Sequence, residues 1–350
     1  MTDPRSRPSL TYAAAGVDND ARARVVDRIR AVAASTHGPE VLAGVGPFAG
    51  LYRLGSYRDP VLVSSTDSVG TKVRIASLLG RFDTIGADLV HQNVNDIITV
   101  GAEPLFFLDY VASSSLDDDA KVAIVEGVAS ACREAGCALV GGETADMPGI
   151  YAAGDLDLVG FVVGVVERDA IIDGSAIAAG DALVGVPSSG LHTNGFSLVR
   201  QALGIGVGGD PAADRARLER DEPELGATLG EALLAPHRGY AGAVAKVRDR
   251  VKGIAHITGG GLVDNVPRVL PQGLGARIER GSWQVPPVFG LIQRAGDIAD
   301  AEMYRTFNMG IGLVLVVAPA GVDAVRAALP DALVIGEVVA SEGGARVVFD

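Results

Sequence analysis

The chain has 350 residues, and 43 acidic against 30 basic side chains give it a formal charge of −13 at neutral pH. Such an acidic chain is not expected to bind nucleic acid or an anionic membrane, because both require a dense face of lysine and arginine. The two cysteines, Cys132 and Cys137, are too few for a disulfide framework or a cysteine-rich zinc site. The first ten residues lack the apolar core of a signal peptide, and no apolar run is long enough to span a membrane, so we expect a cytoplasmic protein.

Hydrophobic patterning predicts two α+β halves of similar size. After a polar arm at residues 1–18, the first half is predicted to contain helices over 21–34, 83–100 and from 117 onward, strands over 60–66, 105–112, 138–140 and 157–166, and a glycine-rich loop over 38–50. After a break at 167–174, the second half is predicted to contain strands over 182–186, 254–257, 311–317, 332–339 and 345–349, helices over 196–202, 224–235, 238–251 and 262–270, and a polar surface loop over 204–221. We therefore predict two domains, at residues 1–168 and 169–350.

The sequence STDSVGTK, at residues 65–72, directly follows a predicted strand. It offers a carboxylate (Asp67), a glycine (Gly70), a hydroxyl (Thr71) and an ammonium group (Lys72). Mg²⁺ prefers carboxylate and phosphate oxygens, and lysine supplies a point charge to a polyphosphate. The segment is therefore a candidate Mg²⁺–phosphate site, and the alternative is a strand–turn–helix corner with surface charges.

Two more carboxylates stand in unusual places. Asn95 and Asp96 lie inside the predicted helix 83–100, where both residue types are unfavourable because their side chains compete for backbone hydrogen bonds. A metal ligand would explain Asp96, and so would an exposed polar face. Glu143 follows a glycine pair at the end of a predicted strand and would point into a cleft as a third carboxylate, unless the segment is an ordinary loop.

Two glycine-containing segments lead from predicted strands into predicted helices: SSGLHTNG at 188–195 and TGGG at 258–261. Free N–H groups at such a junction can hold an anion, although the triple glycine also fits a plain turn. His192, in the first segment, is a candidate acid–base catalyst or phosphoryl contact. Of the other histidines, His37, His91 and His237 are interpreted as solvent or packing residues, and for His256 a structural hydrogen bond competes with ligand contact.

Together these segments favour a metal- and nucleotide-dependent enzyme that acts on a phosphorylated small molecule. Almost end to end, the chain resembles the phosphoribosylformylglycinamidine cyclo-ligase (AIR synthetase) family. The resemblance rests on STDSVGTK, NVNDI with GAEPLFFLDYVA, LVGGETADMPGIY, SSGLHTNGFSLVR, ITGGGLVDNVPRVLP and EMYRTFNMGIG. The first three stretches are also similar to the wider superfamily of FGAM synthetase, selenophosphate synthetase and thiamine-monophosphate kinase, whereas the later ones are more particular to the cyclo-ligases.

The resemblance implies an N-terminal α+β domain whose mixed sheet joins that of a partner subunit in an intersubunit barrel, and a C-terminal α/β domain. It implies a homodimer that holds ATP in a cleft between domains. The implied reaction converts ATP and formylglycinamidine ribonucleotide into 5-aminoimidazole ribonucleotide, ADP and phosphate, in purine biosynthesis. Phosphorylation of the formamide oxygen would be followed by attack of the amidine nitrogen, and catalysis would consist mostly of positioning and charge neutralisation.

The resemblance also implies roles for individual residues. The metal ligands would be Asp67, Asp96 and Glu143, and the catalytic residues would be His192 and Lys72. ATP would be contacted by a mobile glycine-rich segment with Gly44, Gly46 and Phe48, and by Asp67, Gly70, Thr71, Lys72, Asn95 and Asp96. The substrate would be contacted by His192, Thr193, Asn194, Gly259, Gly260 and Gly261. Ser68 stands where relatives commonly have glycine, and Leu191 where proline is often found.

Two other functions remain open at this point. One is another ATP-dependent enzyme of the same superfamily, such as a small-molecule kinase, although such enzymes lack the combination of EMYRTFNMGIG and HITGGGLVDNVPR. The other is a non-catalytic nucleotide-binding regulator, which the intact acidic residues together with Lys72 and His192 make the weaker interpretation.

Overall fold

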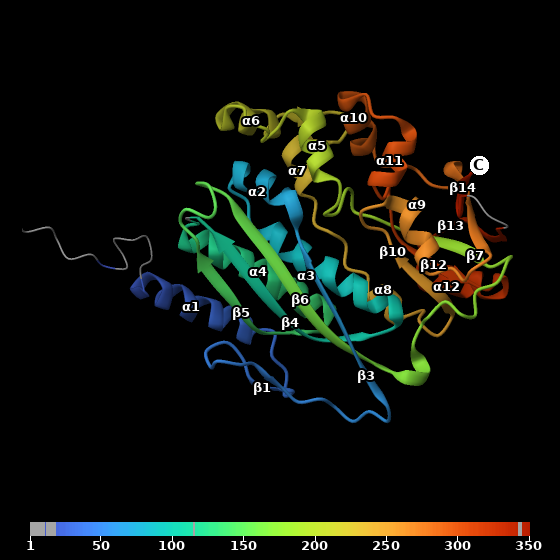
Figure 1. Ribbon diagram of the computed structural model, residues 1–350, viewed down its shortest axis with the longest axis horizontal. Helices are drawn as coiled ribbons and strands as arrows, with labels where there is room; N and C mark the ends of the chain where they lie inside the picture. The colour runs from blue at the N-terminus through green and yellow to red at the C-terminus, as the bar shows by residue number, and fades with distance from the viewer. Residues whose placement is uncertain (1–10, 12–18, 115, 342–344) are drawn as a thin grey trace, which may run out of the picture.

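The computed structural model describes residues 11, 19–114, 116–341 and 345–350, so nearly all of the predicted N-terminal arm lies outside the described residues. Each half of the chain is built on one main sheet, and the halves lie side by side, with the N-terminal elements in blue to green and the C-terminal ones in yellow to red (Figure 1). The predicted two-domain α/β architecture with mixed sheets is confirmed.

The N-terminal sheet has the strand order β3-β6-β4-β5, in which β4 and β5 pair in parallel and the other neighbours pair antiparallel. Its strands are β3 (Pro60–Ser68), β4 (Glu103–Ser113), β5 (Ala138–Asp146) and β6 (Leu156–Glu167). Helices α3 (Asp83–Ile97) and α4 (Asp118–Ala135) pack on one face of this sheet, and α1 (Asn19–Ala34) lies against α4. The short α2 (Val73–Leu79) and a small hairpin of β1 (Val41–Ala43) and β2 (Leu51–Tyr52) complete the domain, so the predicted loop at 38–50 contains a short strand.

Local sequence explains how α4 begins, ends and packs. The Asp117 carboxylate accepts the backbone N–H of Ala120 at 2.7 Å and caps the first turn, and Gly136 ends the helix in the left-handed conformation. Gly127 lets α4 approach α3 closely, because a Cβ at this position would overlap with the carbonyl oxygen of Asp83. The helix pair therefore forms a closely packed layer behind the sheet.

The opposite face of the N-terminal sheet carries apolar side chains that remain accessible. Leu62 on β3 is 63% exposed and Phe161 on β6 is 38% exposed. These two residues alternate along their strands with residues that face the helices. The sheet therefore has one buried face and one apolar face that this chain leaves partly open.

The C-terminal sheet has the order β10-β12-β7-β13-β11-β14, with β11 and β14 parallel and the other neighbours antiparallel. Its strands are β7 (Ala182–Pro187), β10 (Val251–His256), β11 (Leu274–Ile278), β12 (Ile311–Val317), β13 (Leu333–Ala340) and β14 (Val347–Phe349). Every residue of β12 is buried, as its uninterrupted apolar sequence predicts. The helices of this domain are α5 (Phe196–Leu203), α6 (Pro211–Leu218), α7 (Leu229–Leu234), α8 (Ala241–Ala245), α9 (Gly261–Asn265), α10 (Pro287–Gly296), α11 (Asp300–Thr306) and α12 (Val322–Ala328).

The predicted surface loop at 204–221 is wrong, because it contains helix α6. The Asp210 carboxylate accepts the backbone N–H of Ala212 at 3.0 Å, and Pro211 occupies the first helical position. Both are ordinary signals of a helix start. Because a glycine-rich stretch precedes Asp210, these helix-start signals were interpreted as part of a loop.

The two helices predicted between residues 224 and 251 are much shorter than expected. The first is limited to α7, because residues 221–228 form a small hairpin of β8 (Asp221–Glu222) and β9 (Ala227–Thr228) in which Gly226 has a φ of +64°. A capping box between Thr228 and Glu231 then sets the helix start. The second is limited to α8, since the chain must turn before β10.

Candidate active site

A cavity of about 590 Å³ lies between the two domains. Ser65 and Asp67 reach it from β3, and Asp96 from the end of α3. From the C-terminal domain it is lined by His256 at the end of β10 and by Arg268, three residues after α9. The cavity therefore combines carboxylate oxygens from one domain with basic groups from the other.

The two predicted metal ligands Asp67 and Asp96 are far apart in the sequence, but both line the same cavity. Asp67 Oδ1 accepts the backbone N–H of Ser68 at 2.7 Å, and its Oδ2 accepts the side-chain amide of Gln92. Asp96 Oδ2 accepts the hydroxyl of Ser65 at 3.0 Å, and its Oδ1 lies 2.9 Å from His256 Nδ1. These contacts fix both carboxylates at the cavity wall, which is the arrangement that a hard cation requires.

Three polar side chains on α3, those of Asp88, His91 and Asn95, join the two domains. Asn95 is fully buried, where its Oδ1 accepts the N–H of Tyr240 at 2.9 Å and its Nδ2 donates to Arg238 O at 2.9 Å. Asp88 Oδ1 accepts the N–H of His237 at 2.6 Å, and His91 Nδ1 lies 2.5 Å from the carbonyl oxygen of the same residue. The unfavourable residues inside this helix are therefore explained by backbone groups of the C-terminal domain, to which they provide hydrogen-bond partners.

The structure corrects the prediction for Lys72. Its side chain is fully buried, forms an ion pair with Asp88 Oδ2 at 2.7 Å and donates to Ala235 O at 2.8 Å. Burial lowers the pKa of Lys72 and raises that of Asp88, and their mutual attraction offsets only part of this desolvation. The ammonium group expected beside phosphates instead links α3 to the segment that follows α7.

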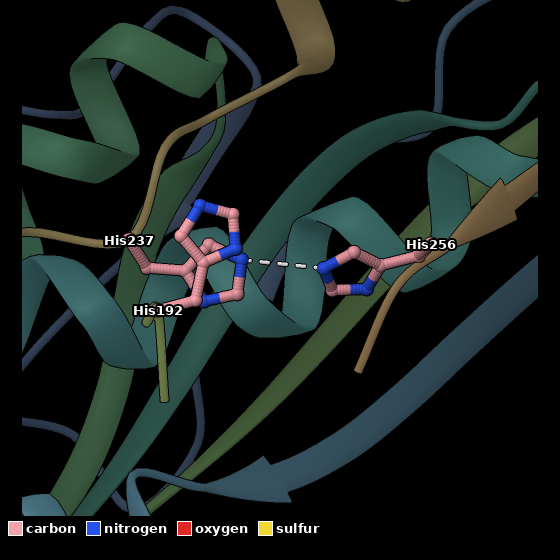
Figure 2. A group of neighbouring side chains, drawn as sticks. All are labelled: His192, His237 and His256. Atoms are coloured by element: carbon pink, nitrogen blue, oxygen red, sulfur yellow. Dashed lines mark hydrogen bonds between the residues drawn. The ribbon is translucent and has the colours of Figure 1, made fainter. Parts of the chain in front are cut away.

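The predicted substrate segment at 192–194 also lies deeper than expected. His192 is 1% exposed and Thr193 is 7% exposed, and the His192 ring stacks on His237 with a centroid distance of 3.9 Å (Figure 2). Burial lowers the pKa of His192 well below its ordinary value, so the ring is neutral. Asn194 lies beside Gly259, and its buried Nδ2 has no hydrogen-bond partner among the described residues. His192 Nε2 accepts the backbone N–H of Ser189 at 3.3 Å, and its Nδ1 has no partner among the described residues. Both His192 and Asn194 therefore keep an unused donor.

The glycine loop at 258–261 is held in place by Asn265. The Nδ2 of Asn265 donates to the carbonyl oxygens of Gly259 at 3.2 Å and Gly261 at 2.9 Å. Gly261 has a φ of +58°, and a Cβ there would overlap with Tyr304 O. Glycine is therefore required by the packing of this loop against α11, in addition to any ligand.

The remaining predicted residues do not reach the cavity within this subunit. Glu143 lies in mid-strand on β5, 55% exposed, and forms an ion pair with Arg22 at 2.8 Å. The predicted strand end at residue 140 is wrong, because β5 continues to pair with β4 as far as Asp146. Since β5 and β3 are opposite edges of the sheet, two strands separate Glu143 from Asp67.

The glycine-rich segment and the turn after β3 are both at the surface. Phe48 is fully exposed, and Gly46, with a φ of +135°, lies against the Arg30 side chain. The Thr71 hydroxyl, one residue after Gly70, lies 3.3 Å from that of Ser197 on α5. These segments are accessible to a ligand, but none of the residues named here is among those that line the cavity.

Sequence reasoning did not single out Arg268 or Asn265 as site residues. Arg268 Nη1 donates to Asn265 Oδ1 at 3.2 Å, so the asparagine links this guanidinium to the glycine loop. Both belong to the NVPR stretch, in which an arginine soon after a glycine loop was the available signal.

The N-terminal and C-terminal domain families described as "AIR synthase related protein" match residues 48–166 and 178–349. The chain is 54% identical to the phosphoribosylformylglycinamidine cyclo-ligase of Sorangium cellulosum (strain So ce56), over 95% of this chain and 96% of that protein. It is 51% identical to the enzyme of the same name from Bordetella petrii, over 98% of each chain. The chain belongs to the phosphoribosylformylglycinamidine cyclo-ligase family. The predicted family and enzyme class are therefore confirmed.

Solved structures of more distant proteins share the fold. A thiamine-monophosphate kinase from Stenotrophomonas maltophilia K279a is 19% identical with a TM-score of 0.63, covering 93% of this chain and 95% of the kinase. The hydrogenase maturation protein HypE in complex with ATP is 19% identical with a TM-score of 0.64, covering 94% of this chain and 91% of HypE. No helix among the described residues is long and apolar enough to cross a membrane.

Proposed function

We propose that the chain cyclises formylglycinamidine ribonucleotide to 5-aminoimidazole ribonucleotide, using ATP and releasing ADP and phosphate, in the cytoplasm. The observation that carries the proposal is the 54% identity to a cyclo-ligase over nearly the whole of both chains. The cavity between the domains supports it, because its acidic and basic lining suits a metal-bound phosphate and an anionic substrate.

Asp67 and Asp96 are the residues that would hold Mg²⁺ with ATP. Their carboxylates line one cavity, and oxygen donors are what Mg²⁺ prefers, so these residues fit the ion. When bound, the ion neutralises phosphate charge. Asn95 supports this site indirectly, because its contacts with the C-terminal domain hold the end of α3 that carries Asp96.

In the proposed chemistry the formamide oxygen accepts the γ-phosphoryl group of ATP, and ADP leaves. The amidine nitrogen of the same molecule then attacks the activated carbon, the bond from carbon to the phosphorylated oxygen breaks, and phosphate departs. The chain contributes mainly orientation and charge: Arg268 neutralises negative charge in the cavity, and Asn194 with the loop at Gly259–Gly261 binds the ribonucleotide. His192 and Thr193 act through the packing of this loop region, since both are buried.

A homodimer would account for the residues that lie outside the cavity. The accessible apolar face that includes Leu62 and Phe161 suits a barrel formed with the sheet of a partner subunit. In such a dimer Glu143 and the segment of Gly44, Gly46 and Phe48 would serve ATP as part of a site that both subunits build. Light scattering coupled to size-exclusion chromatography tests this directly, and a monomer at working concentrations would remove these residues from the proposal.

The function is tested with purified protein, Mg²⁺, ATP and formylglycinamidine ribonucleotide. The expected result is one aminoimidazole product for each ADP released, with no ADP formed when the ribonucleotide is omitted. A phosphorylated product without ring closure would instead identify a small-molecule kinase, and nucleotide binding without turnover a regulator.

A further inference from the structure

Strand β3 and helix α3 meet at the cavity and exchange hydrogen bonds in a reciprocal pattern. On β3, Ser65 and Asp67 are two residues apart and therefore lie on the same face of the strand. On α3, Gln92 and Asp96 are four residues apart and therefore lie on the same side of the helix. Ser65 donates its hydroxyl to Asp96 Oδ2 at 3.0 Å, and Gln92 donates its side-chain amide to Asp67 Oδ2. Each carboxylate is therefore bound by a neutral side chain from the element that carries the other carboxylate.

The partners of two adjacent amides on α3 fix how these amides are oriented. A carboxylate accepts hydrogen bonds and cannot donate them, so Gln92 Nε2 faces Asp67 and Gln92 Oε1 points away from it. Asn93 Nδ2 donates to the main-chain oxygens of Asp67 at 3.4 Å and of Leu89 at 2.8 Å. Gln92 Oε1 and Asn93 Oδ1 are both buried, and neither has a hydrogen-bond partner among the described residues. Both amides therefore direct N–H groups at Asp67 and leave an oxygen unpaired.

The unpaired oxygen of Gln92 lowers the stability of the fold. The side chain is 3% exposed, so this oxygen loses the water that hydrates it in the unfolded chain and gains no hydrogen bond in return. A methionine has a similar length and could fill the same space without burying an amide oxygen. A buried polar group that lacks one of its partners requires an explanation other than packing, and the donor of Gln92 provides one.

The Gln92 amide completes the set of contacts that orients the Asp67 carboxylate. Asp67 Oδ1 accepts the backbone N–H of Ser68 at 2.7 Å, so with Gln92 on Oδ2 each oxygen has one donor. Each oxygen of a carboxylate has two lone pairs, so both can still face a cation in the cavity. A carboxylate held in this way loses less freedom when it binds a metal ion, and hydrogen-bond partners of metal ligands raise metal affinity.

We propose that Gln92 is a positioning residue, which strengthens the metal-dependent binding of ATP by orienting the Asp67 carboxylate. Ser65 has the corresponding role for Asp96. Both roles rest on the proposed function, in which the two carboxylates hold Mg²⁺ with ATP. Gln92 thereby lowers the stability of the fold and raises the affinity of the metal site.

The test compares Gln92→Met with the parent as full-length protein. Titration calorimetry with a non-hydrolysable ATP analogue at several Mg²⁺ concentrations measures the Mg²⁺ affinity of the complex without turnover. This affinity should fall about 10–100-fold in Gln92→Met. The urea midpoint of the variant should equal or exceed that of the parent, because methionine removes the unpaired oxygen while water in the cavity can hydrate the partly exposed Asp67. Loss of a merely structural residue would lower the midpoint and leave the Mg²⁺ affinity unchanged.

Thr84→Val is the matched control. Thr84 also lies on α3 and also has a buried oxygen without a hydrogen-bond partner in the part of the chain that the structure describes. It stands near the opposite end of the helix and does not line the cavity. The control should therefore bind Mg²⁺ and the analogue with parental affinity.

Three results overturn the proposal. The first is parental Mg²⁺ affinity in Gln92→Met, and the second is a lower urea midpoint or a failure to fold in that variant, which would make Gln92 a residue of the fold. The third is a parent protein that binds the analogue equally well with and without Mg²⁺. Turnover of the ribonucleotide is measured separately, and a parent that shows the expected Mg²⁺-dependent binding but forms no imidazole product refutes the cyclo-ligase proposal alone.

Discussion

Replacing Lys72 with methionine tests whether the buried ion pair with Asp88 holds the two domains together. Methionine fills much of the same volume, so the main loss is electrostatic: Asp88 stays buried with His237 N–H as its remaining close donor, and Ala235 O loses a partner. Removing one member of a buried ion pair costs about 3–5 kcal/mol, which is a large share of the total stability of an ordinary domain.

The double variant Lys72→Met/Asp88→Asn separates charge from packing. Asparagine keeps an oxygen for the His237 N–H but carries no charge, so the double variant should be at least about 2 kcal/mol more stable than Lys72→Met alone. As a control, Arg58→Met removes the exposed ion pair with Asp169 and should leave stability almost unchanged.

Urea unfolding followed by circular dichroism and by the fluorescence of the single tryptophan, Trp283, measures these differences. A loss below about 1 kcal/mol in Lys72→Met would refute the structural role. A double variant that is stable but has a greatly raised KM for ATP would also refute the structural role, because that result would mean that the Lys72 ammonium group binds the phosphates of ATP.

Three further predictions follow from the site and the packing around it. Asp67→Asn should lower turnover about 100-fold, since a bound metal ion contributes several kcal/mol to charge stabilisation. Its stability to urea should stay near that of the parent, and an unchanged rate would remove Asp67 from the metal site. Gly261→Ala should lower the free energy of unfolding by about 2 kcal/mol or more, because the residue has a positive φ and the new Cβ would overlap backbone oxygen. Gly281→Ala, where a Cβ has open space, should be nearly neutral, and equal urea midpoints for the two variants would contradict this. Burial lowers the pKa of His192 and His237, so in metal-free buffer the unfolded chain takes up protons below pH 6.5 that the folded chain does not, and stability falls as pH falls by about 1.4 kcal/mol per pH unit for each ring. Between pH 6.5 and 5.5, where the unfolded ring is only partly protonated at the upper end, His237→Gln should therefore lose about 1 kcal/mol less stability than the parent, and parallel slopes for the two proteins would show that the ring is not neutral by burial.

The sequence by itself determined the family, the two-domain architecture and most of the regular elements. Local signals were sufficient where they act locally: β12 is a buried strand because its residues are all apolar, and α4 begins where Asp117 can cap it. Asp67 and Asp96 were also predicted from their positions, and they do line one cavity. Asp96 could be singled out because a carboxylate inside a helix is unfavourable without a partner, and that the two residues hold a metal ion stays a prediction.

Tertiary structure alone decided what each charged or polar group faces. Lys72 stands in a phosphate-like sequence, but Asp88 and Ala235, far away in the chain, enclose it, and desolvation depends on such distant neighbours. Strand order set Glu143 at the far edge of the sheet, since a one-dimensional pattern does not specify which strands become neighbours. His192, His237 and His256 come together for the same reason: the segment after β7, the segment after α7 and the end of β10 are neighbours only because the elements that carry them pack together, and the spacing of residues in the sequence does not specify this packing.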